Sequence, residues 1–335
     1  MINFGIIGAG WRSEFYLRIA SLVPEEFNVT GIYIRNSEKK KEFSHKYNVK
    51  IVDSLDELIM TNPDFVVSCV NKDGICDMIA ELANRNIPVL SETPIGKSSE
   101  QIESFKKQIK PDWKVQVAEQ FHFMPRNQAI KKVINSGIIG EVNYAEISCC
   151  HDYHGISLIR FFLGIKDEIP KVTTFSFPDK LNVYNGRNGT FEKAEERISQ
   201  QKIAILEYKN KTAVYNFSSE QYFSDIRNSR IVIRGTNGEI INDTVTYLDG
   251  TTPISFDLKR NFCGSYENLD GMYLDSIIGN GKILYKNLFT KSRLSDEEIA
   301  IATCLVKMKE YLHNNKDFYN LSDAITDTAT FLNHT

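Results

Sequence analysis

Long hydrophobic runs are absent from this sequence, and neither sign of charge is in strong excess. No apolar stretch approaches the length needed to cross a membrane. The formal net charge of -3 gives no reason to expect nucleic acid or an anionic membrane surface as a partner. We therefore expect the partner to be a small-molecule substrate.

Regular cysteine spacings, repeats and low-complexity segments are absent as well. The six cysteines include no C-x-x-C pair, which suits a reducing compartment. The N-terminus also lacks the basic region and the long apolar region of a secretion signal. Together these absences favour a cytoplasmic location.

What is present is the composition of a globular protein. The chain has 335 residues, of which 42% are hydrophobic and 25% are charged. A chain of this length exceeds one ordinary hydrophobic core, so two domains are expected.

The first residues carry the most informative local pattern. An apolar run from Ile2 ends at Gly8, and Gly10 and Ser13 complete a G-x-G-x-x-S spacing that passes into a helix. Gly8 permits a tight turn, and Gly10 lets the backbone approach a pyrophosphate. The pattern predicts dinucleotide binding, with Trp11 and Arg12 beside the cofactor; the alternative is a glycine turn of another α/β domain.

The residues after the second predicted strand, 29–34, bear on the type of cofactor. An acidic residue ends this strand in folds that prefer NAD, whereas an arginine accommodates the 2′-phosphate of NADP. Here Arg35, Asn36 and Ser37 follow the strand, and no acidic residue ends it. This favours NADP, with NAD possible, although the same residues also fit a solvated helix start.

Strands and helices continue to alternate as far as residue 121. Further strands are predicted at 64–70, 88–91 and 114–118, and helices at 53–59, 75–86 and 99–110. This alternation predicts an α/β domain, residues 1–121, with a doubly wound parallel sheet. Ligands bind such sheets at the carboxyl ends of the strands, which places these residues along one crevice: the glycine turn, Arg35, Asn71, Glu92–Pro94 and Gln120.

A different pattern covers residues 122–335. Alternating strands at 203–208, 212–217 and 230–234, with closing helices at 296–314 and 321–332, predict an α+β domain. Its sheet is expected to be antiparallel with one covered face. Segments 178–190 and 222–228 are expected to be loops that select the substrate.

Several further motifs occur in a specific order. They are Glu92-Thr93-Pro94, Phe123-Met-Pro125, 136–141, His154–Gly164, 234–239 and 320–324. With the glycine turn, they make the sequence similar, over essentially its whole length, to the Gfo/Idh/MocA family of NAD(P)-dependent sugar and cyclitol oxidoreductases. The resemblance implies a Rossmann domain, a second domain with an open-faced antiparallel sheet, substrate at the domain interface, and a homodimer or homotetramer packed through the sheets.

The sequence departs from that family at the catalytic positions. In the family, the lysine of Glu-Lys-Pro bonds the reacting oxygen, and a later histidine, with an aspartate four residues before it, is the acid/base. Here Thr93 stands at the lysine position and Cys150 at the aspartate position, while His154 is kept. Threonine donates a hydrogen bond but does not titrate near neutral pH, whereas imidazole does. The resemblance thus implies His154 as acid/base, Thr93 beside it, and Glu92 and Pro94 near the nicotinamide.

The segment Cys149–His154 admits three interpretations. In the first, His154 is the acid/base, and Tyr153 or Asp152 orients it or the substrate. In the second, cysteine, histidine and aspartate bind a metal, although no second ligand pair at regular spacing is present. In the third, His154 packs or caps at a helix start, with Asp152 as the N-cap of a helix over 156–163.

Two further polar residues lie near the predicted site. His122 stands where the family often has arginine, and it either supplies a cation near the substrate or is an ordinary junction residue. Lys97 follows Thr93 closely in sequence, but it lies beyond Pro94 and Gly96 and is expected to face solvent.

The predicted activity is that of an NAD(P)-dependent oxidoreductase. It would transfer a hydride between nicotinamide and a sugar, cyclitol or imine-type molecule, and the lost lysine favours reduction of an activated C=O or C=N. Two alternatives stay open: a cofactor-binding sensor or regulator without turnover, and a redox-neutral enzyme that retains its cofactor.

Overall fold

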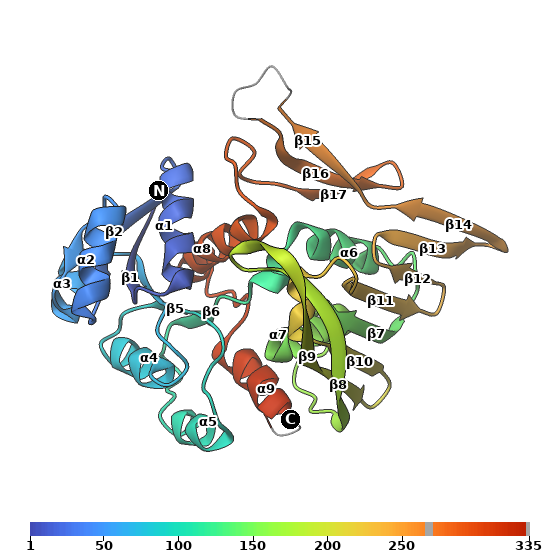
Figure 1. The fold of residues 1–335 in the computed structure, drawn as a ribbon, viewed down its shortest axis with the longest axis horizontal. Coiled ribbons are helices and arrows are strands. Elements are labelled where there is room, and N and C mark those ends of the chain that lie inside the picture. The colour runs from blue at the N-terminus through green and yellow to red at the C-terminus, as the bar shows by residue number, and fades with distance from the viewer. Residues whose placement is uncertain (265–270, 333–335) are drawn as a thin grey trace. The chain divides into compact units, whose positions relative to one another are not determined.

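The computed structural model describes residues 1–264 and 271–332 (Figure 1). The chain divides into two compact units. Of the described residues, the first comprises 1–125, 262–264, 271–275 and 286–329, and the second comprises 126–261, 276–285 and 330–332. The assignment of residues 1–121 to cofactor binding and of residues 122–335 to substrate binding stays a prediction. The structure adds that the segment 286–329 belongs to the first unit.

A six-stranded sheet forms the centre of the first unit. Its strand order is β3-β2-β1-β4-β5-β6, and all neighbouring strands are parallel. This is the order of a dinucleotide-binding Rossmann sheet, in which the chain reverses direction across the sheet between β1 and β4. The predicted doubly wound sheet is confirmed. The strands are β1 Ile2–Ile7, β2 Phe27–Tyr33, β3 Ile51–Val52, β4 Phe65–Ser68, β5 Val89–Ser91 and β6 Val115–Val117.

Helices connect these strands and extend the unit. They are α1 Trp11–Leu22, α2 Ser37–Lys46, α3 Leu55–Met60, α4 Ile75–Asn84, α5 Ser99–Lys106, the 3₁₀ turn η1 Gln120–Phe123, and α8 Asp296–Asn314. The last helix, α9 Leu321–Leu332, runs to the end of the described chain. The predicted bounds of α8 and α9 are confirmed. Helices α4 and α5 end earlier than predicted, and Asn86, with a φ of +59°, breaks the helical backbone after α4.

The core of the first unit follows from its parallel strands. Every residue of β4 is buried, as expected when helices cover both faces of a sheet. Phe4 of β1 stacks on Phe65 of β4 with ring centroids 6.0 Å apart. This dry core holds the carboxyl ends of β1 and β4 side by side.

An eight-stranded sheet dominates the second unit. Its order is β14-β13-β12-β11-β7-β10-β9-β8. The pair β7–β10 is parallel, while all the other neighbouring pairs of this sheet are antiparallel. The predicted antiparallel sheet is confirmed for every neighbouring pair except β7–β10, and this one parallel pair makes the sheet mixed. The reason is that the chain leaves β7 through helix α7 and a hairpin, and returns to run beside β7 in the same direction. The strands are β7 Val142–Ser148, β8 Lys171–Gly186, β9 Gly189–Glu207, β10 Thr212–Phe217, β11 Arg230–Gly235, β12 Gly238–Ile241, β13 Thr244–Asp249 and β14 Thr252–Asp257.

Segment 178–190, expected to be a loop, instead forms paired strands. It is the end of a long hairpin between β8 and β9, with a two-residue turn between Gly186 and Gly189. Leu181 and Val183 of β8 are buried here, whereas residues 187–190 around the turn are exposed, so the polar composition that suggests a loop reflects solvation of the hairpin end. In segment 222–228, the 3₁₀ turn η2 Ser219–Phe223 passes into irregular chain.

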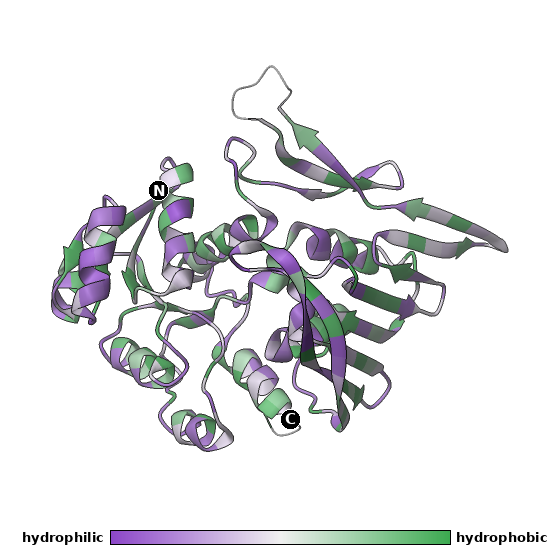
Figure 2. Ribbon diagram, in the orientation of Figure 1, coloured by the Kyte–Doolittle hydropathy of each residue, from purple (hydrophilic) through white to green (hydrophobic). Residues whose placement is uncertain are grey.

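Helix α7 Asp152–Leu163 packs against β7 and β10 of the second unit. Along β10, Ala213, Tyr215 and Phe217 are buried, and the residues between them are more exposed. Figure 2 shows the corresponding alternation of hydrophobic and hydrophilic bands along strands of this sheet. One covered face is thus confirmed.

The remaining elements are a helix and a small sheet. They are α6 Pro125–Asn135 and a three-stranded sheet in the order β15-β16-β17, formed by Lys259–Cys263, Tyr273–Gly279 and Lys282–Lys286. Among residues 1–264 and 271–332, no helix combines the length and the apolar character needed to cross a membrane.

Candidate active site and cofactor site

The turn between β1 and α1 is fixed by Gly8. Its φ is +112°, and a Cβ placed there would lie 2.5 Å from the backbone oxygen of Cys69. The neighbouring backbone leaves no room for a side chain, so only glycine fits. Ser13 closes the turn, because its buried hydroxyl donates to the Gly8 carbonyl at 3.0 Å.

Gly10 has a different role from Gly8. It is the N-cap of α1 with an extended backbone, and no side chain caps the helix. A Cβ at Gly10 would meet no atom within 4 Å. An uncapped helix N-terminus beside open space suits an anionic phosphate group. The turn therefore fits the pyrophosphate of a dinucleotide, with Gly8 shaping the backbone and Gly10 leaving room.

The end of β2 carries the residues that bear on NADP. Asn36 is the N-cap of α2, and its side chain accepts from the backbone nitrogens of Glu38 and Lys39 at 3.0 and 2.9 Å. Arg35 and Ser37 are exposed. Within the described residues, Arg35 has no carboxylate within ion-pair distance, whereas Lys40 pairs with Asp53. Arg35 is thus available for a 2′-phosphate.

The ends of the next two strands bring further predicted residues to the same edge of the parallel sheet. Asn71 follows β4, and its side chain accepts from the Gly74 nitrogen at 3.2 Å. The motif Glu92-Thr93-Pro94 follows β5, and the peptide bond before Pro94 is cis. Lys97 faces solvent as predicted, where it pairs with Asp73 at 2.5 Å.

Glu92 is buried in a network that sequence reasoning missed. Its Oε1 accepts from the Tyr16 hydroxyl at 2.5 Å, and its Oε2 lies 3.5 Å from Nε of Arg12. Arg12 also donates to Glu297 of α8 at 2.9 Å. Burial raises the pKa of the Glu92 carboxyl, and Arg12 and Tyr16 oppose that rise. The N-terminal turn of α1, the end of β5 and the start of α8 are therefore joined by one set of charges.

This network determines the charge of Arg12 and Glu92 and the partners that each already has within the protein. Burial acts to lower the pKa of Arg12, but Glu92 and Glu297 raise it overall, so the guanidinium stays charged. Trp11 beside it is 45% exposed, and its ring centroid lies 4.9 Å from the Arg12 guanidinium carbon. Contacts of Trp11, Arg12 and Glu92 with the cofactor stay predictions. Tyr16 lies four residues after Arg12 on the same helix, so helical spacing could have identified it as a neighbour of Arg12. No local sequence pattern identifies Glu297 as a partner of Arg12.

Glu119 and His122 form a second buried group in the first unit. Burial raises the pKa of the Glu119 carboxyl to about 7, with His122 as the main opposing influence. His122 is 8% exposed, and its ring lies edge-on to Tyr319 at a centroid distance of 5.1 Å. The Tyr319 hydroxyl donates to Asp327 at 2.6 Å. The imidazole thus belongs to a packed polar cluster, and both interpretations of His122 stay predictions.

The raised pKa of Glu119 predicts a pH-dependent stability. The native state holds this proton more tightly than the unfolded chain, whose ordinary value is 4.5, so stability falls as pH rises from 4.5 to about 7. A Glu119→Gln variant removes this titration. We expect the free energy of unfolding of the parent to fall relative to the variant by on the order of 3 kcal/mol across that window. Urea unfolding at several pH values measures it, and parallel profiles would contradict it.

The second unit holds His154 at the start of α7. The helix begins at Asp152, with His151 as its N-cap and no side-chain capping bond. The expectation that Asp152 caps a helix beginning at residue 156 is therefore wrong. Asp152 instead has a φ of +50°, and its backbone nitrogen donates to the Tyr215 hydroxyl at 2.8 Å. The hydroxyl holds a sparsely populated backbone conformation, of the kind found at functional sites.

Aromatic and imidazole rings cluster around His154. The His154 centroid lies 4.3 Å from that of Tyr153 and 4.9 Å from that of His151. His154 is 3% exposed, whereas His151 and Tyr153 are half-buried. The structure therefore brings Tyr153 and His154 together as expected, and it adds His151, which sequence reasoning left without a role.

The metal interpretation of this segment needs a set of converging ligands. The Sγ atoms of Cys149 and Cys150 lie 3.9 Å apart. Among residues 1–264 and 271–332, however, no three histidine, cysteine or acidic side chains come together in a way that could hold a metal ion.

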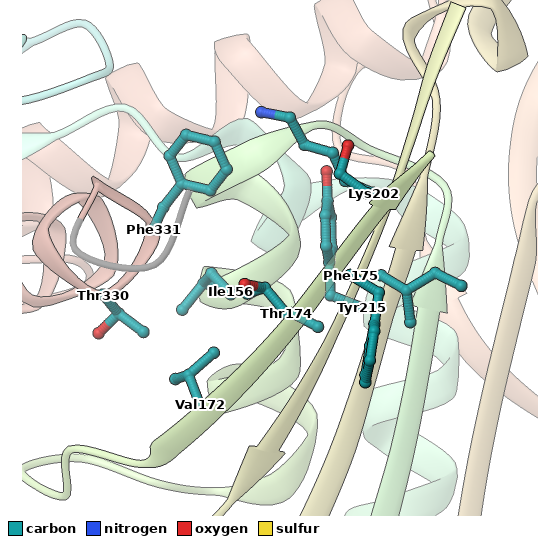
Figure 3. A pocket seen from close by; sticks show the side chains of 11 residues that line it. Ile156, Val172, Thr174, Phe175, Lys202, Tyr215, Thr330 and Phe331 are labelled. Atoms are coloured by element: carbon teal, nitrogen blue, oxygen red, sulfur yellow. The ribbon is translucent and has the colours of Figure 1, made fainter. Parts of the chain in front are cut away.

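An apolar pocket of about 90 Å³ lies beside α7 within the second unit (Figure 3). At its rim, Nζ of Lys202 lies 3.8 Å from the Asp152 carboxylate and 4.8 Å from the Phe331 ring centroid. The pocket fits a hydrocarbon group better than a polyol, so the predicted sugar or cyclitol is not assigned to it. It is lined by Ile156, Val172, Thr174, Phe175, Ser176, Lys202, Ile203, Ala204, Tyr215, Thr330 and Phe331.

Comparison with known sequences gives a family match and a relative. Residues 2–119 match the sequence profile of the GFO_IDH_MocA family, described as an oxidoreductase family with an NAD-binding Rossmann fold. The scyllo-inositol 2-dehydrogenase (NADP+) IolU of Bacillus subtilis is 28% identical over 269 residues, which cover 73% of this chain and 77% of IolU.

Solved structures with the same fold cover nearly the whole chain. An oxidoreductase from Agrobacterium radiobacter, in complex with NAD+, L-tartaric acid and magnesium, matches with a TM-score of 0.68, 16% identity, and coverage of 98% of this chain and 94% of that one. A myo-inositol dehydrogenase from Corynebacterium glutamicum matches with a TM-score of 0.64, 16% identity and the same coverage of 98% and 94%. At such identities, these likenesses show the fold.

Proposed function

We propose that this chain, whose residues 2–119 match the Gfo/Idh/MocA family of oxidoreductases, is a member of that family and transfers a hydride between NADP(H) and a cyclitol or sugar. The observation that carries the proposal is the β1–α1 turn, where Gly8 is sterically required and Gly10 leaves room for a pyrophosphate. The relative IolU is a scyllo-inositol dehydrogenase that uses NADP+, which supports a cyclitol or its keto form as the first substrate to test.

In the proposed chemistry, bound nicotinamide supplies the hydride acceptor or donor. During alcohol oxidation, the substrate carbon loses a hydride while its hydroxyl proton passes to His154, and a C=O bond forms. During reduction, His154 returns that proton to the oxygen. Imidazole suits this task because its pKa lies near working pH. Tyr153, whose ring packs 4.3 Å from that of His154, orients it.

Thr93 bears on the class of substrate that the site can convert. Its hydroxyl donates a hydrogen bond to the reacting oxygen but carries no charge. An unactivated alcohol needs more help to lose its proton than an activated C=O or C=N needs to gain one. We therefore propose that the substrate pair includes an activated C=O or C=N group, and that Thr93 polarises this group.

The test is nicotinamide turnover, followed by absorbance, with scyllo-inositol, its keto form, keto-sugars and cyclic imines, each with NADP(H) and NAD(H). We expect turnover with NADP(H) to exceed turnover with NAD(H). In the variant Arg35→Ala, the KM for NADPH should rise by about 10-fold or more, because a charge-assisted bond to the 2′-phosphate is lost. The KM for NADH should stay within about 2-fold. Equal effects on both cofactors would contradict the role of Arg35.

Because Thr93 replaces the lysine, two other functions stay possible, and the same measurements distinguish them from the proposed one. A protein that binds NADPH but turns over no substrate would be a sensor or regulator. A redox-neutral enzyme would retain cofactor through purification and consume substrate without net change in nicotinamide absorbance. Steady net turnover excludes both.

The open face of the eight-stranded sheet supports self-association. Ile203, paired with Phe175, and Ile205 point away from the face that buries Tyr215, because side chains alternate along β9 and β10. Phe175 is 57% exposed and Ile205 is 36% exposed. Exposed apolar groups on one sheet face fit a homodimer or homotetramer. Sedimentation analysis measures the oligomeric state. The cytoplasmic location stays a separate prediction.

A further inference from the structure

His151 is held by one tyrosine hydroxyl at two points. Its backbone nitrogen donates to the Tyr222 hydroxyl at 2.8 Å, and its Nδ1 lies 2.6 Å from the same oxygen. Two short contacts to one atom fix both the backbone and the ring of His151. The proposed acid/base role of His154 does not depend on these two contacts between His151 and Tyr222.

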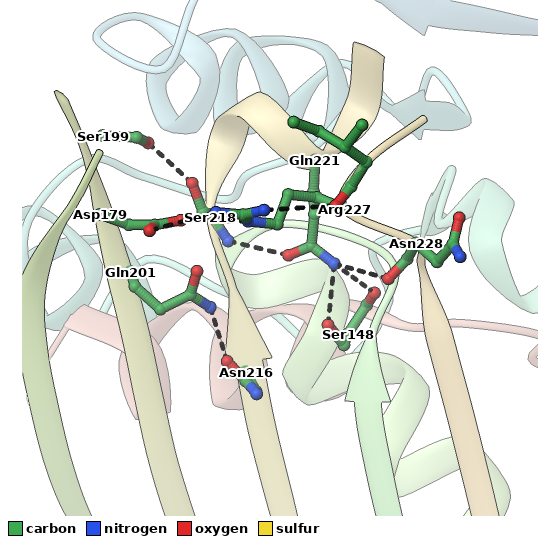
Figure 4. A network of polar contacts seen from close by, with 10 residues as sticks. Ser148, Asp179, Ser199, Gln201, Asn216, Ser218, Gln221, Arg227 and Asn228 are labelled. Atoms are coloured by element: carbon green, nitrogen blue, oxygen red, sulfur yellow. Dashed lines mark hydrogen bonds and ion pairs between the residues drawn. The ribbon is translucent and has the colours of Figure 1, made fainter. Parts of the chain in front are cut away.

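The turn that carries Tyr222 is itself anchored, as Figure 4 shows. The side chain of Gln221 donates to the carbonyl and the hydroxyl of Ser148 at 3.1 and 2.9 Å, and to the carbonyl of Asn228 at 3.2 Å. Its Oε1 accepts from the Ser218 nitrogen at 3.2 Å. Ser148 ends β7, the strand that leads into His151. Tyr222 is therefore fixed relative to the imidazole that it contacts.

The hydroxyl supports both protonation states of His151. Burial raises the pKa of Tyr222, so the phenol keeps its proton at neutral pH. When His151 is neutral, the hydroxyl accepts from the backbone nitrogen and donates to Nδ1, which leaves the ring proton on Nε2. When His151 is protonated, Nδ1 donates to the hydroxyl instead. The ring keeps one orientation throughout, as a group that exchanges protons requires.

We propose that His151, oriented by Tyr222, is a second imidazole of the substrate site, and that its Nε2 hydrogen-bonds the reacting oxygen of the polyol or keto substrate. This inference rests on the proposed oxidoreductase function. His151 is half-buried whereas His154 is 3% exposed, so His151 is the more accessible imidazole of the pair. It supplies a titrating donor in a protein that lacks the lysine at position 93. The titratable side chains against His151 are Tyr153, His154 and Tyr222. Those that neighbour this group are Cys149, Cys150, Asp152, Tyr215 and, through Asp152, Lys202.

The first test needs no turnover. Diethylpyrocarbonate modifies accessible neutral histidines, and peptide mass spectrometry reports the rate at each one. The exposed His45 and His313 serve as internal references. We expect Tyr222→Phe to raise the rate at His151 by about 3-fold or more, because the bond to Nδ1 is lost. The matched control is Tyr184→Phe, whose hydroxyl bonds Asp225 in the same unit, and it should leave the His151 rate unchanged. An unchanged rate in Tyr222→Phe overturns the proposal.

The second test uses saturating NADP+ with scyllo-inositol, or with the best substrate of the turnover panel. We expect this mixture to slow modification of His151 relative to His45 and His313. Equal modification with and without ligand, in a protein that turns over that substrate, would overturn the inference while leaving the oxidoreductase function intact. Failure to bind NADP(H) would instead reject the oxidoreductase function.

The third test separates positioning from catalysis. We expect His151→Asn to lower kcat/KM by about 10-fold or more and to remove one ionisation from its pH profile. Tyr222→Phe should lower kcat/KM by about 5-fold in the parent but by less than about 2-fold in the His151→Asn background. Additive losses would show that Tyr222 acts independently of His151.

Discussion

Replacing His154 by asparagine is expected to lower kcat/KM by about 10²- to 10⁴-fold, the usual contribution of a positioned general acid/base. Asparagine fills much of the same volume and still forms hydrogen bonds, but it neither accepts nor releases a proton near neutral pH. His154 is 3% exposed and packs against the rings of Tyr153 and His151. A polar side chain of similar size is therefore the mildest change that removes the chemistry.

The measurement compares steady-state turnover with cofactor affinity. NADPH binding should be largely retained, because the pyrophosphate is assigned to the turn beside Gly10, which this substitution leaves intact. His313→Asn, at the exposed end of α8, is a matched control that should retain parental activity. A His154→Asn protein as active as the parent would remove His154 from the mechanism and leave His151 as the first candidate.

The first unit could be predicted from sequence because its information is local. Gly8 marks a turn that no other residue can make, and the buried run of β4 is typical of a parallel strand. The helix α8 was predictable to its ends, since Ser295 and Glu298 form a capping box at its start. What sequence did not indicate is that α8 returns to the first unit, where Glu297 meets Arg12.

The second unit was harder to predict because its information is distributed. The first half of β9 is almost wholly exposed and lacks the apolar alternation that identifies a half-buried strand, whereas its second half, predicted at 203–208, has that alternation. The parallel pairing of β7 with β10 depends on how the chain crosses over, which no local pattern records. Among the site residues, His154 was found through a motif, whereas the partnership of His151 with Tyr222 joins residues 71 positions apart.

The two glycines of the β1–α1 turn should respond differently to the same substitution. For Gly10→Ala, the new methyl group meets no protein atom within 4 Å, and the backbone φ of -89° is allowed for alanine. The free protein should therefore keep its stability. If the pyrophosphate occupies the space beside Gly10, the methyl group should weaken NADPH binding by about 10- to 100-fold, the cost of overfilling a packed contact.

Gly8→Ala should damage the protein itself. Its Cβ would lie 2.5 Å from the Cys69 carbonyl oxygen at a φ of +112°, so the turn must shift and the free protein should lose about 1–3 kcal/mol or more of stability. Thermal unfolding with and without NADPH distinguishes the two variants. Gly10→Ala should match the parent without cofactor and gain less from NADPH, whereas Gly8→Ala should unfold earlier in both conditions. Full stabilisation of Gly10→Ala by NADPH would show that the cofactor does not approach α1 through Gly10, which would withdraw the observation on which the proposed function rests.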